Sequence, residues 1–272
     1  MKRLQARFDA LAARGRKALV PFVTAGDPAL EATVPVLHAL VAAGADVLEL
    51  GVAFSDPMAD GPVIQRSSER ALARGAGLAW VLGCVRRFRE HDGETPVVLM
   101  GYLNPVEIRG AQAFAREAVA AGVDGVLLVD LPQEEARPFR DAFDAEGLAL
   151  VPLVAPTTSD ARLPAVCSDG RGYLYYVSLA GVTGDQVADP GAVADRLQHV
   201  RAHSRLPLLV GFGIRDAATA AAMAVHADGV VVGSALVEVL AASTDPADAA
   251  ARAGRFLAPL RAALDGVAAA LR

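Results

Sequence analysis

The chain has 272 residues, and 26 Lys and Arg against 31 Asp and Glu give a formal net charge of −5. This balance excludes proteins that bind duplex nucleic acid through a broad basic surface. Hydrophobic residues make up 53% of the chain and charged residues 21%, which excludes disorder and allows one large core. No apolar run reaches the roughly 18 residues of a membrane span, and two cysteines cannot form a disulfide framework. We therefore expect a soluble, cytosolic protein.

The first 17 residues are basic, but Arg7 and Asp9 interrupt the apolar stretch that a secretory signal would need. Leu4, Phe8 and Leu11 recur at helical spacing, which predicts a short amphipathic helix packed on the body of the protein. A transit peptide is the alternative.

Short apolar segments then alternate with longer helical patterns. The predicted strands, each bounded by Gly, Pro, Asp or Ser, are residues 18–24, 47–51, 96–100, 125–129, 148–154, 174–178, 208–211 and 229–232. The predicted helices, rich in Ala, Leu, Arg and Glu, are residues 30–43, 64–73, 80–91, 111–121, 134–146, 192–203, 217–224, 236–241 and 246–272. The strands are apolar on both faces, which is typical of parallel strands joined by helices.

Eight strand–helix units in this length predict an α/β protein, a single (β/α)8 TIM barrel over residues 1–272 with an extra N-terminal helix. A doubly wound open sheet is the alternative. The turn after the first strand, Thr24-Ala-Gly-Asp-Pro28, lacks the Gly-x-Gly-x-x-Gly pattern of a dinucleotide site. No linker divides the chain, so one domain is expected.

The active site of such a barrel lies at the C-terminal ends of its strands. Glu49 lies inside an apolar strand, on the face of Val47, where an unpaired carboxylate is costly. Burial raises the pKa of a carboxyl group, which suits proton transfer near neutral pH; the alternative is a structural ion pair. The loop that follows is long and polar, and it ends in Asp60, which either serves the chemistry or caps the next helix.

Glycines follow the last two strands, at Gly211-Phe-Gly213 and at Gly233-Ser234. Backbone N–H groups and a helix N-terminus at these places favour a phosphate site, to which Gly181–Gly184 could add donors. Ordinary turn chemistry is the alternative. His199 and His203 are spaced i, i+4 without a third ligand, so no metal site is predicted.

Residues 49–65, ELGVAFSDPMADGPVIQ, closely resemble the signature of the tryptophan synthase alpha chain family. The similarity runs almost end to end, through residues 21–28, 101–105, 125–132, 155–158, 175–178, 181–184, 211–214 and 233–235. It implies a cytoplasmic lyase of tryptophan biosynthesis. Such an enzyme cleaves indole-3-glycerol phosphate to indole and D-glyceraldehyde 3-phosphate by a retro-aldol reaction.

The resemblance also implies roles for single residues. Glu49 would perform the acid and base work, Asp60 would accept the indole N–H, and Tyr175 would lie beside the substrate and position Glu49 or the glyceryl moiety. The implied substrate contacts are Phe22, Met100, Leu127, Thr183, Phe212 and Val231. The implied phosphate contacts are Gly184, Gly213, Gly233 and Ser234, and Asp130 and Thr183 would stand behind the substrate.

The family works in a heterotetramer with a beta chain that carries pyridoxal phosphate, so no cofactor is expected on this chain. The implied interface residues are Ala53, Asp56, Pro57, Asn104, Pro105 and Pro132, the last three in turns. Ala53 replaces the usual proline, and Leu179 replaces a frequent arginine, which bears on loop order and on activation by the partner. The alternatives are a stand-alone lyase, a non-catalytic binding subunit and a barrel acting on a sugar phosphate.

Overall fold

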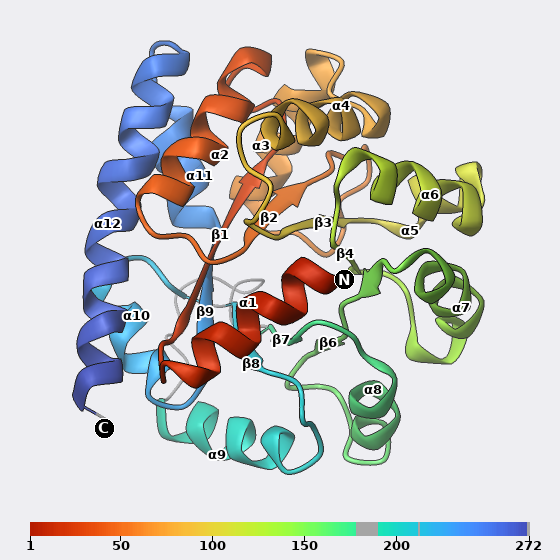
Figure 1. Cartoon of the computed structure of the whole chain (residues 1–272), viewed down its shortest axis with the longest axis vertical. Coiled ribbons are helices and arrows are strands. Elements are labelled where there is room, and N and C mark those ends of the chain that lie inside the picture. The colour runs from red at the N-terminus through yellow and green to blue at the C-terminus, as the bar shows by residue number, and fades with distance from the viewer. Residues whose placement is uncertain (178–189, 212, 271–272) are drawn as a thin grey trace.

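The computed structural model describes residues 1–177, 190–211 and 213–270, with the backbone alone for residues 190–192. A ring of parallel strands stands inside a ring of helices (Figure 1). The strands are β1 Ala18–Thr24, β2 Leu48–Gly51, β3 Val97–Gly101, β4 Gly125–Leu128, β5 Ala149–Leu150, β6 Leu153–Val154, β7 Leu174–Tyr176, β8 Leu208–Val210 and β9 Gly229–Val232. Their order in the sheet is β5-β4-β3-β2-β1-β9-β8-β7-β6.

The two ends of this sheet are consecutive pieces of one chain segment. Residues 148–154 were predicted as a single strand, but Pro152 has no N–H to donate, and β5 and β6 lie on either side of it. On one side Val151 N donates to Val126 O at 2.8 Å, and on the other Tyr175 N donates to Pro152 O at 3.0 Å. The segment therefore closes the ring, which confirms the predicted eight-stranded barrel and excludes the open sheet.

The helices lie outside the strands, with α1 across one end of the barrel (Figure 1). The α-helices are α1 Lys2–Ala13, α2 Thr33–Ala42, α3 Pro62–Ala73, α4 Leu78–Arg89, α5 Leu103–Arg109, α6 Ala111–Ala121, α7 Arg137–Glu146, α8 Leu163–Asp169, α9 Pro190–Arg201, α10 Ala217–Ala224, α11 Ser234–Ala241 and α12 Pro246–Ala270, and the 3-10 turns are η1 Leu30–Ala32 and η2 Gln133–Glu135. Helices α5 and α8 were not predicted. Asn104 and Pro105, expected in a turn, instead lie in the first turn of α5, where proline is tolerated.

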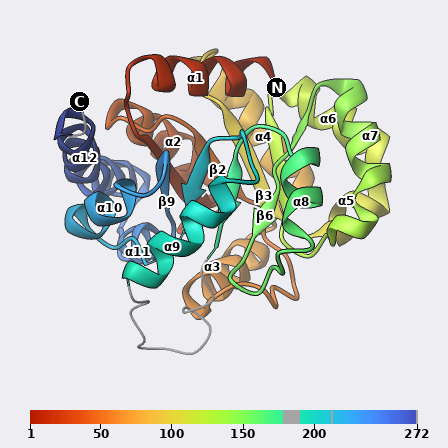
Figure 2. The same cartoon turned by 90° about the horizontal axis from the view of Figure 1, so that it is seen from below.

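The barrel interior is apolar near its N-terminal end. Val20, Val47, Leu127 and Val231 point inward and form one buried cluster with Leu4, Phe8 and Leu11 of α1. The N-terminal helix was therefore predicted correctly, and it closes this end of the barrel. Figure 2 shows α1 on the opposite side of the molecule from α3, which follows β2 at the C-terminal end of the strands.

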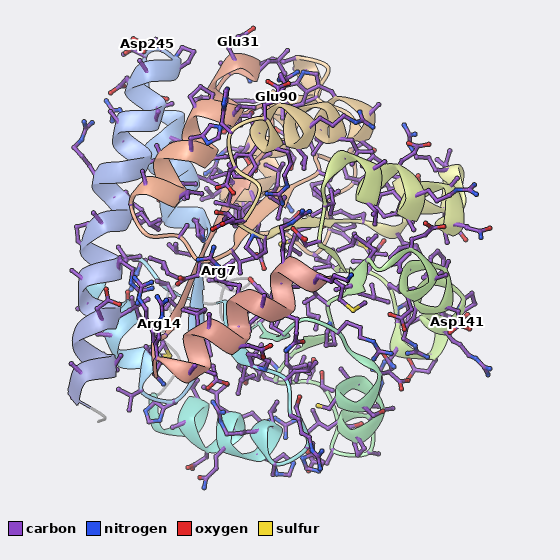
Figure 3. The ribbon with its side chains drawn as sticks, viewed as in Figure 1. Arg7, Arg14, Glu31, Glu90, Asp141 and Asp245 are labelled. Carbon is purple, nitrogen blue, oxygen red and sulfur yellow. The ribbon has the colours of Figure 1, made fainter. Side chains whose placement is uncertain are left out.

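Buried ion pairs tie the N-terminal ends of neighbouring strands together. Asp46 precedes β2, accepts from Leu19 N at 2.9 Å and pairs with Arg261 at 2.9 Å. Asp124 precedes β4 and does the same for β3, accepting from Val97 N at 3.0 Å and pairing with Arg89 at 2.9 Å. By contrast, Glu31, Glu90, Asp141 and Asp245, labelled in Figure 3, are exposed to solvent. This end of the barrel is built for stability.

Candidate active site

Glu49 is fully buried and points into the barrel. In the register of the sheet it stands between Phe22 of β1 and Val98 of β3, while Leu48 and Leu50 pack in the outer core, as predicted. The Tyr173 hydroxyl donates to Glu49 Oε1, and Oε2 has no hydrogen-bond partner among the described residues. Burial raises the pKa of Glu49 to about 7, and the Tyr173 hydroxyl opposes that rise. The carboxyl can therefore give or take a proton near neutrality.

Two tyrosines face Glu49: Tyr173, which immediately precedes β7, and Tyr175 within β7. Tyr173, which was not predicted, donates the hydrogen bond to Glu49, and the role of Tyr175 in positioning Glu49 or the glyceryl moiety stays a prediction. Tyr175 is buried, and its pKa is raised well above the usual value by burial first and then by the charges of Glu49 and Asp60. Residues two apart in a strand share a face, so the Tyr173-Leu-Tyr175 pattern could have revealed the missing residue. Gly211 leaves the room for this ring, since a Cβ there would lie 2.1 Å from the Tyr175 hydroxyl.

Asp60 lies at the C-terminal end of the barrel, in the loop between β2 and α3. Its Oδ2 accepts from the Tyr102 hydroxyl at 3.0 Å. Burial raises the pKa of Asp60 to about 6, and the hydrogen bond from Tyr102 opposes that rise. The N-cap of α3 is Gly61, without a side-chain cap, so the helix-cap alternative for Asp60 is wrong. In the described part of the chain, neither Asp60 nor Glu49 pairs with a cation.

The loop that carries Asp60 is held by its neighbours. The Gln65 side chain donates to the carbonyl of Asp60 at 2.9 Å and to that of Pro57 at 3.3 Å. Below it, Ser67 on α3 shares a buried hydrogen bond of 2.6 Å with Thr24 of β1. The loop is thus fixed to the barrel wall and not free at its base.

Apolar side chains line the space beside the two carboxyl groups. Phe22, Met100 and Asp60 line one small pocket at the C-terminal end of the strands. The Phe22 ring lies against Gly51, where a Cβ would come within 2.6 Å of it, and its Cβ lies near Gly233. Leu127 and Val231 are buried deeper, on the inner face. The structure thus brings four of the predicted substrate contacts to the interior, and Thr183 and Phe212 lie outside the described residues.

The predicted phosphate residues lie at the ends of β8 and β9. Gly213 has a φ of +64°, a conformation that favours glycine, and it is exposed. Gly233 is the N-cap of α11, whose first residue, Ser234, is also exposed. A helix N-terminus presents unpaired N–H groups to an anion. Gly184 lies outside the described residues.

The predicted partner residues divide by exposure. Asp56, Asn104 and Pro132 are exposed, and Pro57 and Pro105 are half-buried. Ala53 is buried in this chain and packs with Ala71 and Ala76, so it lies behind the loop, and its assignment to the interface stays a prediction. Leu179, the second departure from the family pattern, lies outside the described residues.

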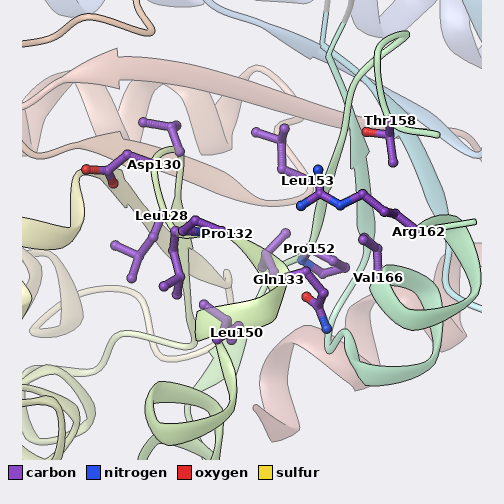
Figure 4. A pocket seen from close by; sticks show the side chains of 14 residues that line it. Leu128, Asp130, Pro132, Gln133, Leu150, Pro152, Leu153, Thr158, Arg162 and Val166 are labelled. Atoms are coloured by element: carbon purple, nitrogen blue, oxygen red, sulfur yellow. The ribbon is translucent and has the colours of Figure 1, made fainter.

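A second cavity, of about 290 Å³, opens where β5 and β6 part (Figure 4). Asp130 and Pro132 line it from the loop after β4, and Leu153 and Arg162 from the opposite side. Val129 lines both this cavity and the Asp60 pocket. The two spaces therefore share a wall at the end of β4.

Other motifs carry no chemistry in the part of the chain that the structure describes. No group of His, Cys, Asp or Glu within it could hold a metal ion. His199 instead contacts Asp160 at 3.0 Å on the surface. None of the helices described has the length and hydropathy needed to cross a bilayer.

Known proteins resemble this chain over nearly its whole length. The profile of the family described as "Tryptophan synthase alpha chain" matches residues 8–264. The tryptophan synthase alpha chain of Xanthomonas axonopodis pv. citri (strain 306) is 66% identical over 266 residues, which cover 97% of this chain and 99% of that one.

Solved structures agree with these sequence matches. Tryptophan synthase subunit alpha from Legionella pneumophila str. Paris superposes with a TM-score of 0.90 at 46% identity, covering 97% of this chain and 98% of that chain. Mycobacterium tuberculosis tryptophan synthase gives 0.87 at 37% identity, covering 96% and 97%. The chain therefore belongs to the tryptophan synthase alpha chain family, the lyases that cleave indole-3-glycerol phosphate in tryptophan biosynthesis.

Proposed function

We propose that Glu49 and Asp60 together carry the retro-aldol cleavage of indole-3-glycerol phosphate in this chain. The observation that supports this assignment is a pair of carboxyl groups, Glu49 buried and Asp60 half-buried, each hydrogen-bonded to a tyrosine and neither paired with a cation in the described residues. Tyr175 lies within electrostatic reach of both. With pKa values of about 7 and about 6, Glu49 can be protonated while Asp60 is ionised near neutral pH.

Glu49 supplies and recovers a proton. The protonated carboxyl transfers its proton to C3 of the indole ring, which becomes tetrahedral and leaves positive charge on the ring nitrogen. The resulting carboxylate then removes the proton from the substrate's hydroxyl group on the glycerol carbon that is attached to C3. As that carbon becomes a carbonyl, its bond to C3 breaks, and the electron pair of the bond returns to the ring. Indole leaves with the new C3 proton, and Glu49 is again protonated.

Asp60 stabilises the charge that develops in this step. Its carboxylate accepts the indole N–H, and in a site shielded from water such preorganised charge lowers a barrier by several kcal/mol. Tyr102 occupies Oδ2, so Oδ1 is the oxygen available to the substrate. Phe22, Met100, Leu127 and Val231 form the apolar wall against which the flat ring packs.

The phosphate of the substrate binds at the ends of β8 and β9. Gly213, Gly233 and Ser234 offer backbone N–H groups there, and the N-terminus of α11 adds a favourable dipole. Thr183, Gly184 and Phe212 complete the substrate site in the proposal.

The chain works with a beta chain in a cytoplasmic heterotetramer. Pyridoxal phosphate belongs to that partner, and this chain needs no cofactor for the cleavage. Exposed Asp56, Asn104 and Pro132 belong to elements that follow β2, β3 and β4, so they fit one surface at the end of the barrel where the substrate binds. The product indole would pass to the partner through this surface.

Release of indole from indole-3-glycerol phosphate by the purified chain tests the proposal. We expect measurable cleavage alone and a rise in turnover when a beta chain is added. Turnover that a beta chain does not change would favour a stand-alone lyase. Absence of cleavage under both conditions would contradict the proposal and leave a binding subunit or a barrel that acts on a sugar phosphate.

A further inference from the structure

We propose that Tyr102 is a positioning residue for the reaction, which holds the Asp60 carboxylate in place and in its ionised form through the phenol hydroxyl. The inference rests on the proposed function of Asp60. In the sequence Tyr102 belongs to the stretch 101–105, one of those that carry the family resemblance.

The hydroxyl of Tyr102 lies in a short chain of hydrogen bonds. Ala59 N donates to the phenol oxygen at 3.0 Å, and the phenol donates to Asp60 Oδ2 at 3.0 Å. A hydroxyl that accepts one hydrogen bond is a stronger donor for the next. Because Ala59 immediately precedes Asp60, the same oxygen fixes both the backbone and the carboxylate.

The position of Tyr102 is fixed by contacts of both its ring and its backbone. Its side chain is buried at 5% exposure, and its ring stacks on Phe54 with centroids 5.1 Å apart and planes at 26°. Tyr102 is also the N-cap of α5, and the next residue, Leu103, donates its N–H to Asp130 Oδ1 at 2.7 Å. A donor fixed in this way cannot follow the carboxylate, so the carboxylate must adopt the position that the phenol sets.

The charges around Asp60 explain why this contact matters. Burial favours the neutral acid, and the Tyr102 hydroxyl is the hydrogen bond that opposes it. Asp130 adds a further negative charge near Tyr102, and Glu49 and Asp60 both act on Tyr175 across the barrel. A neutral Asp60 would lose the negative charge that stabilises the cationic ring. The phenol therefore acts on the reaction through Asp60, from the wall of the pocket that Tyr102 shares with Phe22 and Met100.

The inference is tested by replacing Tyr102 with Phe, which removes the hydroxyl and keeps the ring on Phe54. The probe is a non-cleavable analogue that keeps the indole ring and the terminal phosphate but lacks the side-chain hydroxyls. Its affinity is measured by calorimetry between pH 5 and pH 9 in a Glu49→Gln background, so that Asp60 is the acid of the pair that still titrates.

We expect Tyr102→Phe to weaken binding about twofold at pH 7 and about tenfold at pH 5, where Asp60 is mostly protonated and its ionised fraction falls in proportion to the rise in its pKa. The pH at which binding is half lost should rise by about one unit, since a tenfold change in ionisation is one unit of pKa. When Asp60→Asn is also present, Tyr102→Phe should change the affinity less than twofold, because the carboxylate it serves is gone.

Tyr176→Phe is the matched control. It also removes a buried phenol, but on the outer face of β7, in the core with Leu197 and Val210. Affinity and pH midpoint should stay unchanged in this variant. If Tyr102→Phe does not fold, Phe54→Leu takes its place, because it removes the ring that stacks on Tyr102, changes no charge, and should shift the midpoint in the same direction by a smaller amount.

An unchanged pH midpoint in Tyr102→Phe would overturn the inference. So would a loss of affinity that is equal with Asp60 and with Asp60→Asn, because that result is expected if the Tyr102 hydroxyl serves only in packing. Cleavage by the wild-type chain is measured alongside. If the wild type does not cleave, the proposed function itself fails, and this result is distinct from an active wild type with an unaffected Tyr102→Phe variant.

Discussion

The two ends of the barrel bury carboxyl groups in opposite ways. At the N-terminal end Asp46 and Asp124 each accept from a backbone N–H and pair with an arginine. At the C-terminal end Glu49 and Asp60 are held by tyrosine hydroxyls. Glu49 is as deeply buried as Asp46 and Asp124, so among these three the partner decides the chemistry: a cation compensates a fixed charge, whereas a phenol leaves the proton free to move.

The pKa values follow from this difference. Burial raises the pKa of Asp46, but the Leu19 amide and then Arg261 and Arg16 oppose the rise. For Glu49 the Tyr173 hydroxyl is what opposes it among the residues that the structure describes, and the pKa reaches about 7. Glu49 and Asp60, with pKa values of about 7 and about 6, therefore lie on the side of the barrel where active sites of this fold are found.

The largest expected effect is that of Glu49→Gln at the C-terminal end. The amide keeps the shape of the side chain and can still accept from Tyr173, but it cannot carry the proton to C3 or remove the hydroxyl proton. We expect turnover to fall by at least about 10³-fold, in the range of general acid–base catalysis. The rate of indole release measures this. A variant that retains a tenth of the wild-type rate would remove Glu49 from the mechanism.

Two substitutions of Asp60, at the same end, distinguish the role of its charge from that of its size. Asp60→Ala removes the acceptor of the indole N–H, and a loss of about 10²- to 10³-fold in turnover is expected, as for a lost charge-stabilising group. Asp60→Glu keeps the carboxylate and should lose less. The two rates, compared with the wild type, measure the role. Equal rates for Ala and the wild type would contradict it.

The strands were predictable because their apolar runs end at Gly, Pro, Asp or Ser. Strand β1, Ala18–Thr24, and strand β9, Gly229–Val232, have the predicted bounds. Helices α5 and α8 have seven residues each, too few for a periodic pattern to stand out. The division of residues 148–154 at Pro152 depends on pairing with two different neighbours, which no local pattern contains.

The site was predictable where a residue conflicts with its local surroundings. Glu49 is such a case, since a carboxyl group in an apolar strand requires an explanation. Tyr102 and Tyr173 conflict with nothing in the sequence, because tyrosine is ordinary in a strand or at its end. Their roles arise only from the folded ring, which brings Tyr173 to Glu49 over a separation of 124 positions.

At the N-terminal end, Arg261→Met should affect stability and not catalysis. Arg261 is 8% exposed in its side chain and pairs with the buried Asp46. Removal of one partner leaves a buried charge, so the free energy of unfolding should fall by about 3 kcal/mol. Urea unfolding measures the loss, and turnover of the folded variant should stay within twofold of the wild type. A large loss of turnover without loss of stability would contradict the division between the two ends.

The free energy of unfolding should fall as pH rises, because the buried Glu49 carboxyl must then ionise inside the barrel. Its pKa is about 7 in the folded state and 4.5 in the reference state. Between these values the folded state binds a proton that the unfolded state has lost, so the free energy of unfolding falls as pH rises. The 2.5-unit difference between the two values corresponds to about 3 kcal/mol, present in full below pH 4.5 and lost above pH 7.

Glu49→Gln removes this titration and so isolates it. Unfolding in urea at pH 5 and at pH 8 should show the variant gaining stability on the wild type by a few kcal/mol over that range. Arg261→Met retains Glu49 and should run parallel to the wild type. If Glu49→Gln gave no pH-dependent gain, the carboxyl group would already be ionised in the folded state at pH 5. It would then be held as Asp46 is, and the contrast between the two ends would rest on Asp60 alone.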